Sequence, residues 1–142
     1  MKKFIALLAA TIFLVSVSPA QKISSSKVPA KVKQGFTKEF PGITPQWEKE
    51  KGQYEAGFKQ KGHTMSALFN EDGSMEESEM GIKITELPEA TRDYVKKYFS
   101  SSVIKEASKI TKSGGEVNYE VGLKNKDLIF DADGNFLKEV VE

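Results

Sequence analysis

The sequence has no cysteine and only one histidine and one tryptophan among its 142 residues. Without cysteine the chain can form no disulfide and can carry no lipid on a cysteine at its N-terminus. The one histidine, His63, follows Gly62 at an expected hairpin tip and has no second histidine or cysteine with which to share a metal ion. A hydrolytic triad would have to use this residue, and no Gly-x-Ser-x-Gly motif is present. The sequence therefore predicts no catalytic residue, no metal site and no cofactor.

The first 20 residues are typical of a secretory signal peptide. Met1-Lys2-Lys3 is basic, residues 4–17 are almost wholly apolar, and Ser18-Pro19-Ala20 provides a small-residue cleavage site before Gln21. The apolar run is shorter than the roughly 20 residues of a transmembrane helix, so no stable membrane insertion is expected after cleavage. Residues 21–27 are polar and serine-rich and are predicted to form a flexible leader. A retained membrane anchor is the alternative.

The charges of the mature chain nearly balance. Cleavage after residue 20 removes two of the 21 basic residues and leaves 19 basic against 20 acidic residues. A nucleic-acid partner would require a basic stripe, so this class of partner is excluded.

The remaining chain carries one pattern twice, in residues 28–86 and 87–142. Val28-Pro29 matches Leu87-Pro88 at a spacing of 59 residues, and each pair precedes a segment with apolar residues at helical spacing. The phrases QYEAGFK and NYEVGLK then share a tyrosine and the alternation typical of strands. Each repeat is predicted to contain one helix followed by about four strands.

Similar phrases, LFNEDGSM and LIFDADGNF, lie near the end of the two repeats. Asp-Gly between apolar strand ends predicts a tight hairpin in which glycine supplies the positive φ. Connections this short allow only antiparallel neighbours. The predicted fold is therefore α+β, with the two helix-plus-meander units forming one extended antiparallel sheet and both helices on one face. Gly35 should weaken the first helix by roughly 0.5–1 kcal/mol relative to alanine, and its missing side chain should let a strand approach closely.

This arrangement resembles the PepSY-like (putative β-lactamase-inhibitor-like) periplasmic proteins of Bacteroidetes. The resemblance covers residues 28–142 and depends on the signal peptide, the two tandem units and the two Asp-Gly phrases. It implies a periplasmic or secreted protein that binds an enzyme or another protein with the open face of its sheet. The β-lactamase inhibitory protein itself carries disulfides that this chain lacks, so no inhibitory residue is transferred to it.

Two acidic groups have a structural and a functional interpretation. Asp131, Asp133 and Asn135 are similar to part of a calcium loop, but Gly134 follows too early for the full loop, and a hairpin is favoured with weak calcium binding left open. The run of Glu76, Glu77 and Glu79 is interpreted as a solvated strand edge that discourages aggregation. The alternative for this run is a patch for a basic partner.

Trp47 and the polar positions of the tyrosine strands are the candidate partner-binding residues. Trp47 has no aromatic counterpart in the second repeat; packing under the first helix is favoured, and an exposed binding anchor is the alternative. The polar positions on the strand face opposite the helices are Glu55, Lys59, Glu120 and Lys124.

These residues predict a non-enzymatic binding protein with an unknown envelope protein or cell-wall component as its partner. A structural or stress-related envelope protein without a specific ligand is the alternative. A small hydrolase is the third hypothesis, and it lacks an evident nucleophile.

Overall fold

The computed structural model describes residues 20–141, so the expected signal peptide lies outside the described residues except for Ala20. The strands are β1 (Gln21–Ile23), β2 (Gln46–Glu50), β3 (Gln53–Gln60), β4 (His63–Phe69), β5 (Met75–Ile82), β6 (Glu106–Lys112), β7 (Val117–Gly122), β8 (Lys126–Asp131) and β9 (Phe136–Val141). The α-helices are α1 (Ala30–Glu39) and α2 (Glu89–Tyr98), and the 3-10 helices are η1 (Ser25–Lys27) and η2 (Ile84–Glu86). The nine strands form one sheet in chain order, and every neighbouring pair is antiparallel. The fold is the predicted α+β meander, in which the β5–β6 pairing joins the two units.

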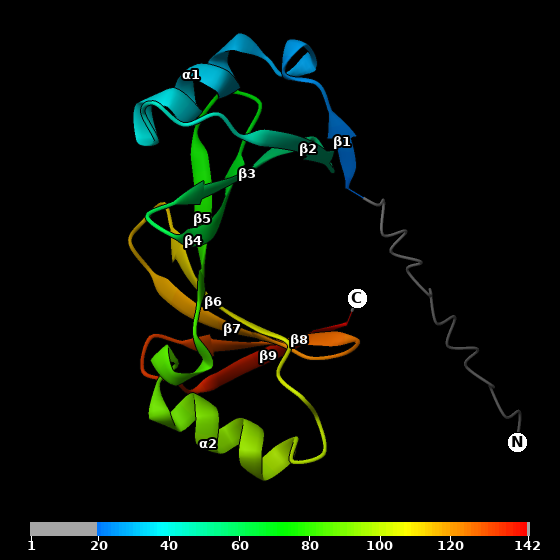
Figure 1. Cartoon of the computed structure of the whole chain (residues 1–142), viewed down its shortest axis with the longest axis vertical. Coiled ribbons are helices and arrows are strands. Elements are labelled where there is room, and N and C mark those ends of the chain that lie inside the picture. The colour runs from blue at the N-terminus through cyan, green and yellow to red at the C-terminus, as the bar shows by residue number, and fades with distance from the viewer. Residues whose placement is uncertain (1–19, 142) are drawn as a thin grey trace, which may run out of the picture.

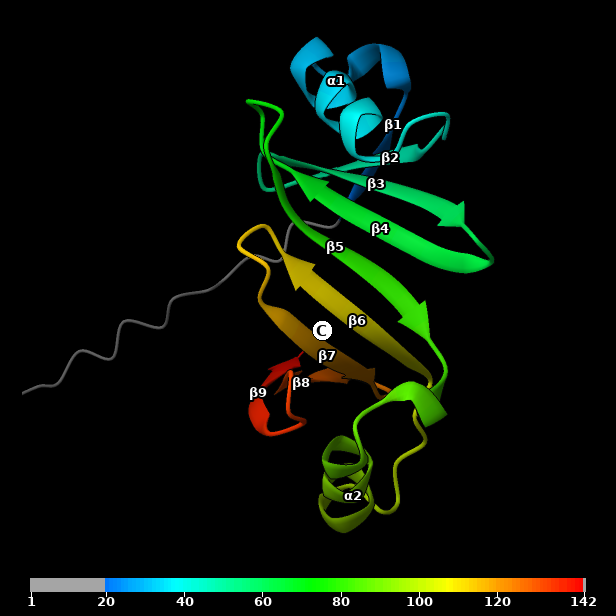
Figure 2. The same cartoon turned by 90° about the vertical axis from the view of Figure 1, so that its left-hand side faces the viewer.

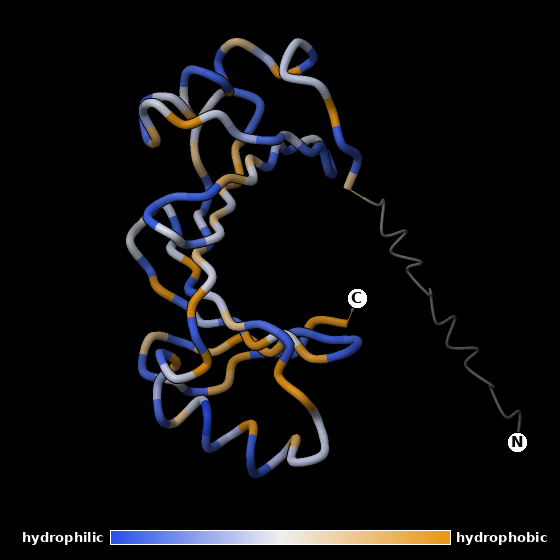
Figure 3. Tube along the Cα trace, viewed as in Figure 1, coloured by the Kyte–Doolittle hydropathy of each residue, from blue (hydrophilic) through white to orange (hydrophobic). Residues whose placement is uncertain are grey.

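The sheet is strongly bent, and both helices pack on its outer side (Figure 1). Helix α1 covers the strands of the first unit at one end, and α2 covers those of the second unit at the other end (Figure 2). Hydrophilic and hydrophobic residues alternate along much of the chain (Figure 3), as expected for strands with one covered face. The opposite, concave face carries no helix and is called the open face below.

Both helices begin directly after a proline, as the sequence predicts. Pro29 and Pro88 have φ values of -55° and -52° and precede the first residues of α1 and α2. Proline fits this position because its fixed φ suits a helix start and its missing N–H would have no partner within the helix.

The two Asp-Gly phrases form equivalent turns. The Gly73 N–H donates to the Asn70 carbonyl at 2.9 Å, and the Gly134 N–H donates to the Asp131 carbonyl at 3.0 Å. Both glycines have positive φ, +90° and +88°, which glycine adopts at little cost. The hairpin prediction is confirmed in both units.

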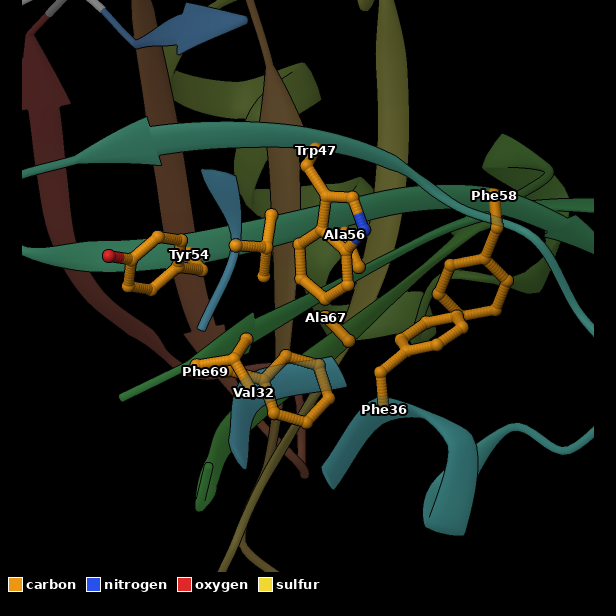
Figure 4. Packing of buried hydrophobic residues seen from close by; sticks show 9 residues of the cluster. Val32, Phe36, Trp47, Tyr54, Ala56, Phe58, Ala67 and Phe69 are labelled. Carbon is orange, nitrogen blue, oxygen red and sulfur yellow. The ribbon is translucent and has the colours of Figure 1, made fainter. Parts of the chain in front are cut away.

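The first core lies between α1 and strands β2–β4 (Figure 4). Phe36 on α1 is its centre, with ring centroids 5.6 Å from Trp47 and 5.2 Å from Phe58. Trp47 is only 4% exposed, so the favoured core interpretation is correct and the residue offers no surface anchor in this conformation. Trp47 must therefore be removed from the candidate partner-binding residues.

The second core repeats the plan with different side chains. Phe130 is fully buried between β8 and α2, and the Tyr94 ring stacks on Phe136 at 4.8 Å. The two repeat tyrosines hold equivalent positions, because Tyr54 pairs with Phe69 and Tyr119 pairs with Phe130. Tyr54 is buried whereas Tyr119 is half-buried. The two units therefore share the same strand register, but the equivalent tyrosine is less buried in the second unit.

Residues 21–27 are not the flexible leader expected from their serine content. Gln21–Ile23 forms β1 and pairs with β2, and Ser25–Lys27 forms η1. Ile23 packs against the first core. It is the one apolar residue before Val28 in a polar segment, so the sequence pattern did not indicate a strand there.

Candidate functional site

Three adjoining hollows line the open face over β2–β6. Their volumes are about 530, 380 and 280 Å³. Thr64 lines the first two, Glu79 the last two, and Glu55 the first and third, so the hollows are continuous. We call this continuous depression the trough.

Small residues make the floor of the trough low. Gly57 pairs with Ser66 across β3 and β4, and Gly81 pairs with Ser108 across β5 and β6. A Cβ atom at Gly57 would meet nothing nearer than 4.0 Å, so neighbouring atoms do not require the glycine there. Glycine inside a strand often marks a place where another chain or ligand approaches the backbone closely.

A line of alternating glutamates and serines crosses the open face on five consecutive strands, β3 to β7. Its members, here called the acidic diagonal, are Glu55, Ser66, Glu79, Ser108 and Glu120. Ser66 is the cross-strand partner of Glu79, and Ser108 is that of Glu120. The Ser66 side chain also hydrogen-bonds Glu55, and that of Ser108 hydrogen-bonds Glu79. The first two glutamates are thereby held in place by the serine of the next strand.

Partial burial disfavours the charged form of all three glutamates. Burial raises the pKa of Glu55 and of Glu79, and the hydrogen bonds from Ser66 and Ser108 oppose this rise only in part. Burial raises the pKa of Glu120 to about 8, and negative charges nearby add to the effect. The two ion pairs found among the described residues, Lys112–Glu77 and Lys126–Glu139, include no member of the diagonal.

Glu120 faces charged groups from the strands on both sides. Glu79 on β5, Glu106 on β6 and Asp127 on β8 raise its pKa further by repulsion. Lys109 on the neighbouring strand β6 pairs with Tyr119 and belongs to the opposite face of the sheet. On the face of Glu120, the nearest lysine by register is Lys138 on β9, which pairs with Ile129 and so lies two strands away. The surroundings of Glu120 therefore favour its protonated form in the free protein.

Replacing Glu120 with glutamine should make the protein more resistant to unfolding at alkaline pH. Between the unfolded pKa of about 4.5 and the folded pKa of about 8, the folded protein retains a proton that the unfolded chain has lost. Stability conferred by this group therefore falls as the pH rises through that window. We expect the Tm difference between E120Q and wild type to be near zero at pH 4.5 and largest above pH 8. The same substitution at exposed Glu71 should leave a constant difference, and parallel curves for E120Q would contradict the assignment.

Asn118 lies on the same face of β7, two residues before Glu120. Its side chain is 8% exposed, and its Oδ1 atom has no hydrogen-bond partner. An unpaired buried acceptor is unfavourable. The region around Glu120 is therefore rich in hydrogen-bond acceptors, and a hydrogen-bond donor placed there would be stabilised.

The predicted site residues fall in different places. Glu55 and Glu120 belong to the acidic diagonal, and exposed Lys59 lines the largest hollow. Lys124 is exposed in the turn after β7, which ends at Gly122, so it does not lie on the strand with Glu120. Whether these four residues contact a partner stays a prediction.

Sequence reasoning missed Ser66 and Ser108, and it named Glu79 only within an acidic run for which a patch for a basic partner was the alternative interpretation. The acidic run was interpreted as a solvated edge, which is wrong because β5 pairs with β4 on one side and β6 on the other. The alternation of Glu77, Glu79 and Gly81 was the available signal, since residues two apart share one face of a strand. No sequence pattern distinguished Ser66 and Ser108 from the other serines of the chain.

In the acidic turn of the second repeat, the Asp131 carboxylate accepts hydrogen bonds from residues of the same turn. Asp131 Oδ1 accepts hydrogen bonds from the Asn135 N–H at 2.8 Å and the Asp133 N–H at 3.0 Å. Hydrogen bonds from Asn135 lower the pKa of Asp131. Within residues 20–141, no group of three or more histidine or acidic side chains is arranged to hold a metal ion.

The fold defines an α+β protein with two helix-plus-meander repeats and one open sheet face. The family described as putative beta-lactamase-inhibitor-like, PepSY-like matches residues 16–73 and again residues 52–138. The chain belongs to this family, and the two overlapping matches agree with the internal repeat.

Solved structures from Bacteroides share the fold. A putative periplasmic protein from Bacteroides eggerthii superposes with a TM-score of 0.70 at 18% identity, covering 80% of this chain and 88% of that one. A DUF2874 family protein from Bacteroides ovatus gives 0.68 at 18% identity, covering 80% and 86%. A BLIP-like protein from Bacteroides fragilis gives 0.65 at 19% identity, covering 80% and 86%. No curated protein matches the sequence. Neither described α-helix is long and apolar enough to cross a membrane.

Proposed function

We propose that this protein is a non-enzymatic binding protein of the periplasm or of secreted material, and that it recognises a protein partner through the open face of its sheet. The observation that carries the proposal is the trough, a hollowed face of the sheet that neither helix covers. The predicted signal peptide and the periplasmic relatives support the location. A cell-wall component is the other class of partner that the sequence leaves open.

The chemistry of the trough supports recognition rather than catalysis. Its polar lining consists mainly of carboxylates, hydroxyls and lysines. The single histidine, His63, has its Nδ1 atom 3.0 Å from the Gly81 carbonyl oxygen, and this contact joins β4 to β5. Its ring therefore has a structural use in the sheet.

A bulky residue in the trough should abolish partner capture. Thr64 is exposed and lines two of the hollows, so Thr64→Trp should fill the trough without disturbing the core. Thr37 is exposed on α1 and gives a matched Thr37→Trp control on the helix side. We expect proteins enriched from an envelope fraction by wild type and by T37W to be lost with T64W. Equal capture by all three proteins would contradict recognition through the open face, and the absence of any specific capture by wild type would favour a structural envelope role.

A further inference from the structure

We infer that the trough, together with the adjoining Glu120 on β7, binds a cationic peptide segment of the partner, with lysine or arginine side chains about three to four residues apart that pair with Glu55, Glu79 and Glu120. This inference rests on the proposed function and specifies the chemistry of the partner.

Charge on the open face is unbalanced. Acidic side chains line the trough from β2 to β6, namely Glu48, Glu50, Glu55, Glu77, Glu79 and Glu106, of which Glu77 is paired with Lys112. The lysines among the lining residues are Lys22, Lys51, Lys59 and Lys105, and all four lie near the ends of strands or in the connections between them. The centre of the trough is therefore negative, and a cationic partner is complementary to it.

The electrostatics of the diagonal also favour a cation. Burial and repulsion from neighbouring carboxylates raise the pKa values of its three glutamates, and a bound ammonium or guanidinium group would reverse this by stabilising the carboxylates. The unpaired Oδ1 atom of Asn118 is a further acceptor on the same face. Lysine and arginine side chains are donors only, so they match a lining that consists of acceptors at these positions.

The spacing of the glutamates sets the length of the segment. Successive glutamates lie two strands apart and are offset by two residues along the strand direction. In a flat sheet this corresponds to about 10 Å across the strands and about 7 Å along them. Their Cα atoms are then about 12 Å apart, and side chains on a concave face converge from that distance. A polyproline II segment rises about 9 Å in three residues and presents every third side chain on one side. An extended segment can thus place one cation at each glutamate.

Binding of two synthetic peptides tests the inference. The probe is a dye-labelled Gly/Ser peptide with three lysines at every third position, and its control has the same composition with the lysines adjacent. We expect fluorescence anisotropy at pH 7.5 to give at least threefold tighter binding for the spaced peptide. Its affinity should fall at least tenfold for the E55Q/E79Q/E120Q variant and less than twofold for E39Q/E71Q/E116Q, which makes the same three glutamate-to-glutamine changes at exposed positions.

The outcomes separate this inference from the proposed function. Equal binding of the two peptides, equal loss in both triple variants, or no binding of either peptide would overturn the cationic segment. If T64W abolishes partner capture while E55Q/E79Q/E120Q retains it, the open face binds the partner and the cationic chemistry is wrong. If partner capture survives T64W, recognition through the open face is contradicted, and the cationic segment is contradicted with it.

Discussion

Gly35→Ala should destabilise the protein strongly, although alanine is normally the better helix residue. A Cβ atom at Gly35 would lie 2.1 Å from the carbonyl oxygen of Gly73 in the β4–β5 turn. The obstacle is backbone and cannot rotate away, so α1 and the turn must separate and open the first core. Helix propensity alone predicts a gain of roughly 0.5–1 kcal/mol. We expect instead a loss of about 3 kcal/mol, at the upper end of typical overpacking effects, measured by urea unfolding.

Gly114→Ala is the matched control for Gly35→Ala. Gly114 lies in the β6–β7 turn, does not have a positive φ, and has nothing within 4 Å of a built Cβ atom. Its substitution should leave the free energy of unfolding in urea within about 0.5 kcal/mol of wild type, as for ordinary surface changes. If G35A is as stable as G114A, the helix does not contact the turn as described.

Phe36→Ala should have the second large effect. The Phe36 ring contacts the rings of Phe40, Trp47, Phe58 and Phe69, and the side chain is 2% exposed. Truncating a buried phenylalanine costs about 3–5 kcal/mol, a large part of the 5–15 kcal/mol typical of a whole domain. The buried Trp47 beside it provides the fluorescence signal for unfolding.

Tyr98→Ala is the aromatic control for Phe36→Ala. Tyr98 is 59% exposed on α2, where its ring contacts Tyr94 at 4.6 Å. Its loss should lower stability by about 1 kcal/mol, because an aromatic pair contributes roughly 0.5–1.5 kcal/mol and the exposed Tyr98 ring buries little further area. Comparable effects of F36A and Y98A would show that α1 is not anchored through Phe36.

The fold was predictable because local signals and the repeat agree. Prolines mark the two helix starts, Asp-Gly marks the closing turns, and alternation identifies β3 and β7. The repeat then excludes most other topologies, since two similar meanders joined in chain order give one antiparallel sheet. Segment β1 escaped prediction because three residues with one apolar side chain carry too little periodicity.

The site was predictable only in part, because it depends on pairing between the repeats. Glu55 and Glu120 follow from the alternation of their own strands, but Glu79 joins them only once β5 is known to lie in the middle of the sheet. The serines of the diagonal acquire their role from cross-strand register. From the sequence, Trp47 could point toward the helix or toward the open face of the sheet. The contact between the rings of Phe36 and Trp47 shows that it points toward the helix.

Photo-crosslinking in cells tests most directly the claim that the open face binds a partner. A benzophenone amino acid would replace Lys59, which is exposed at the largest hollow, or Lys97, which is exposed on α2. Crosslinks to one defined envelope protein from position 59, and none from position 97, are the result expected here. Crosslinks from position 97 with none from position 59 would place the partner on the helix side and contradict recognition through the open face.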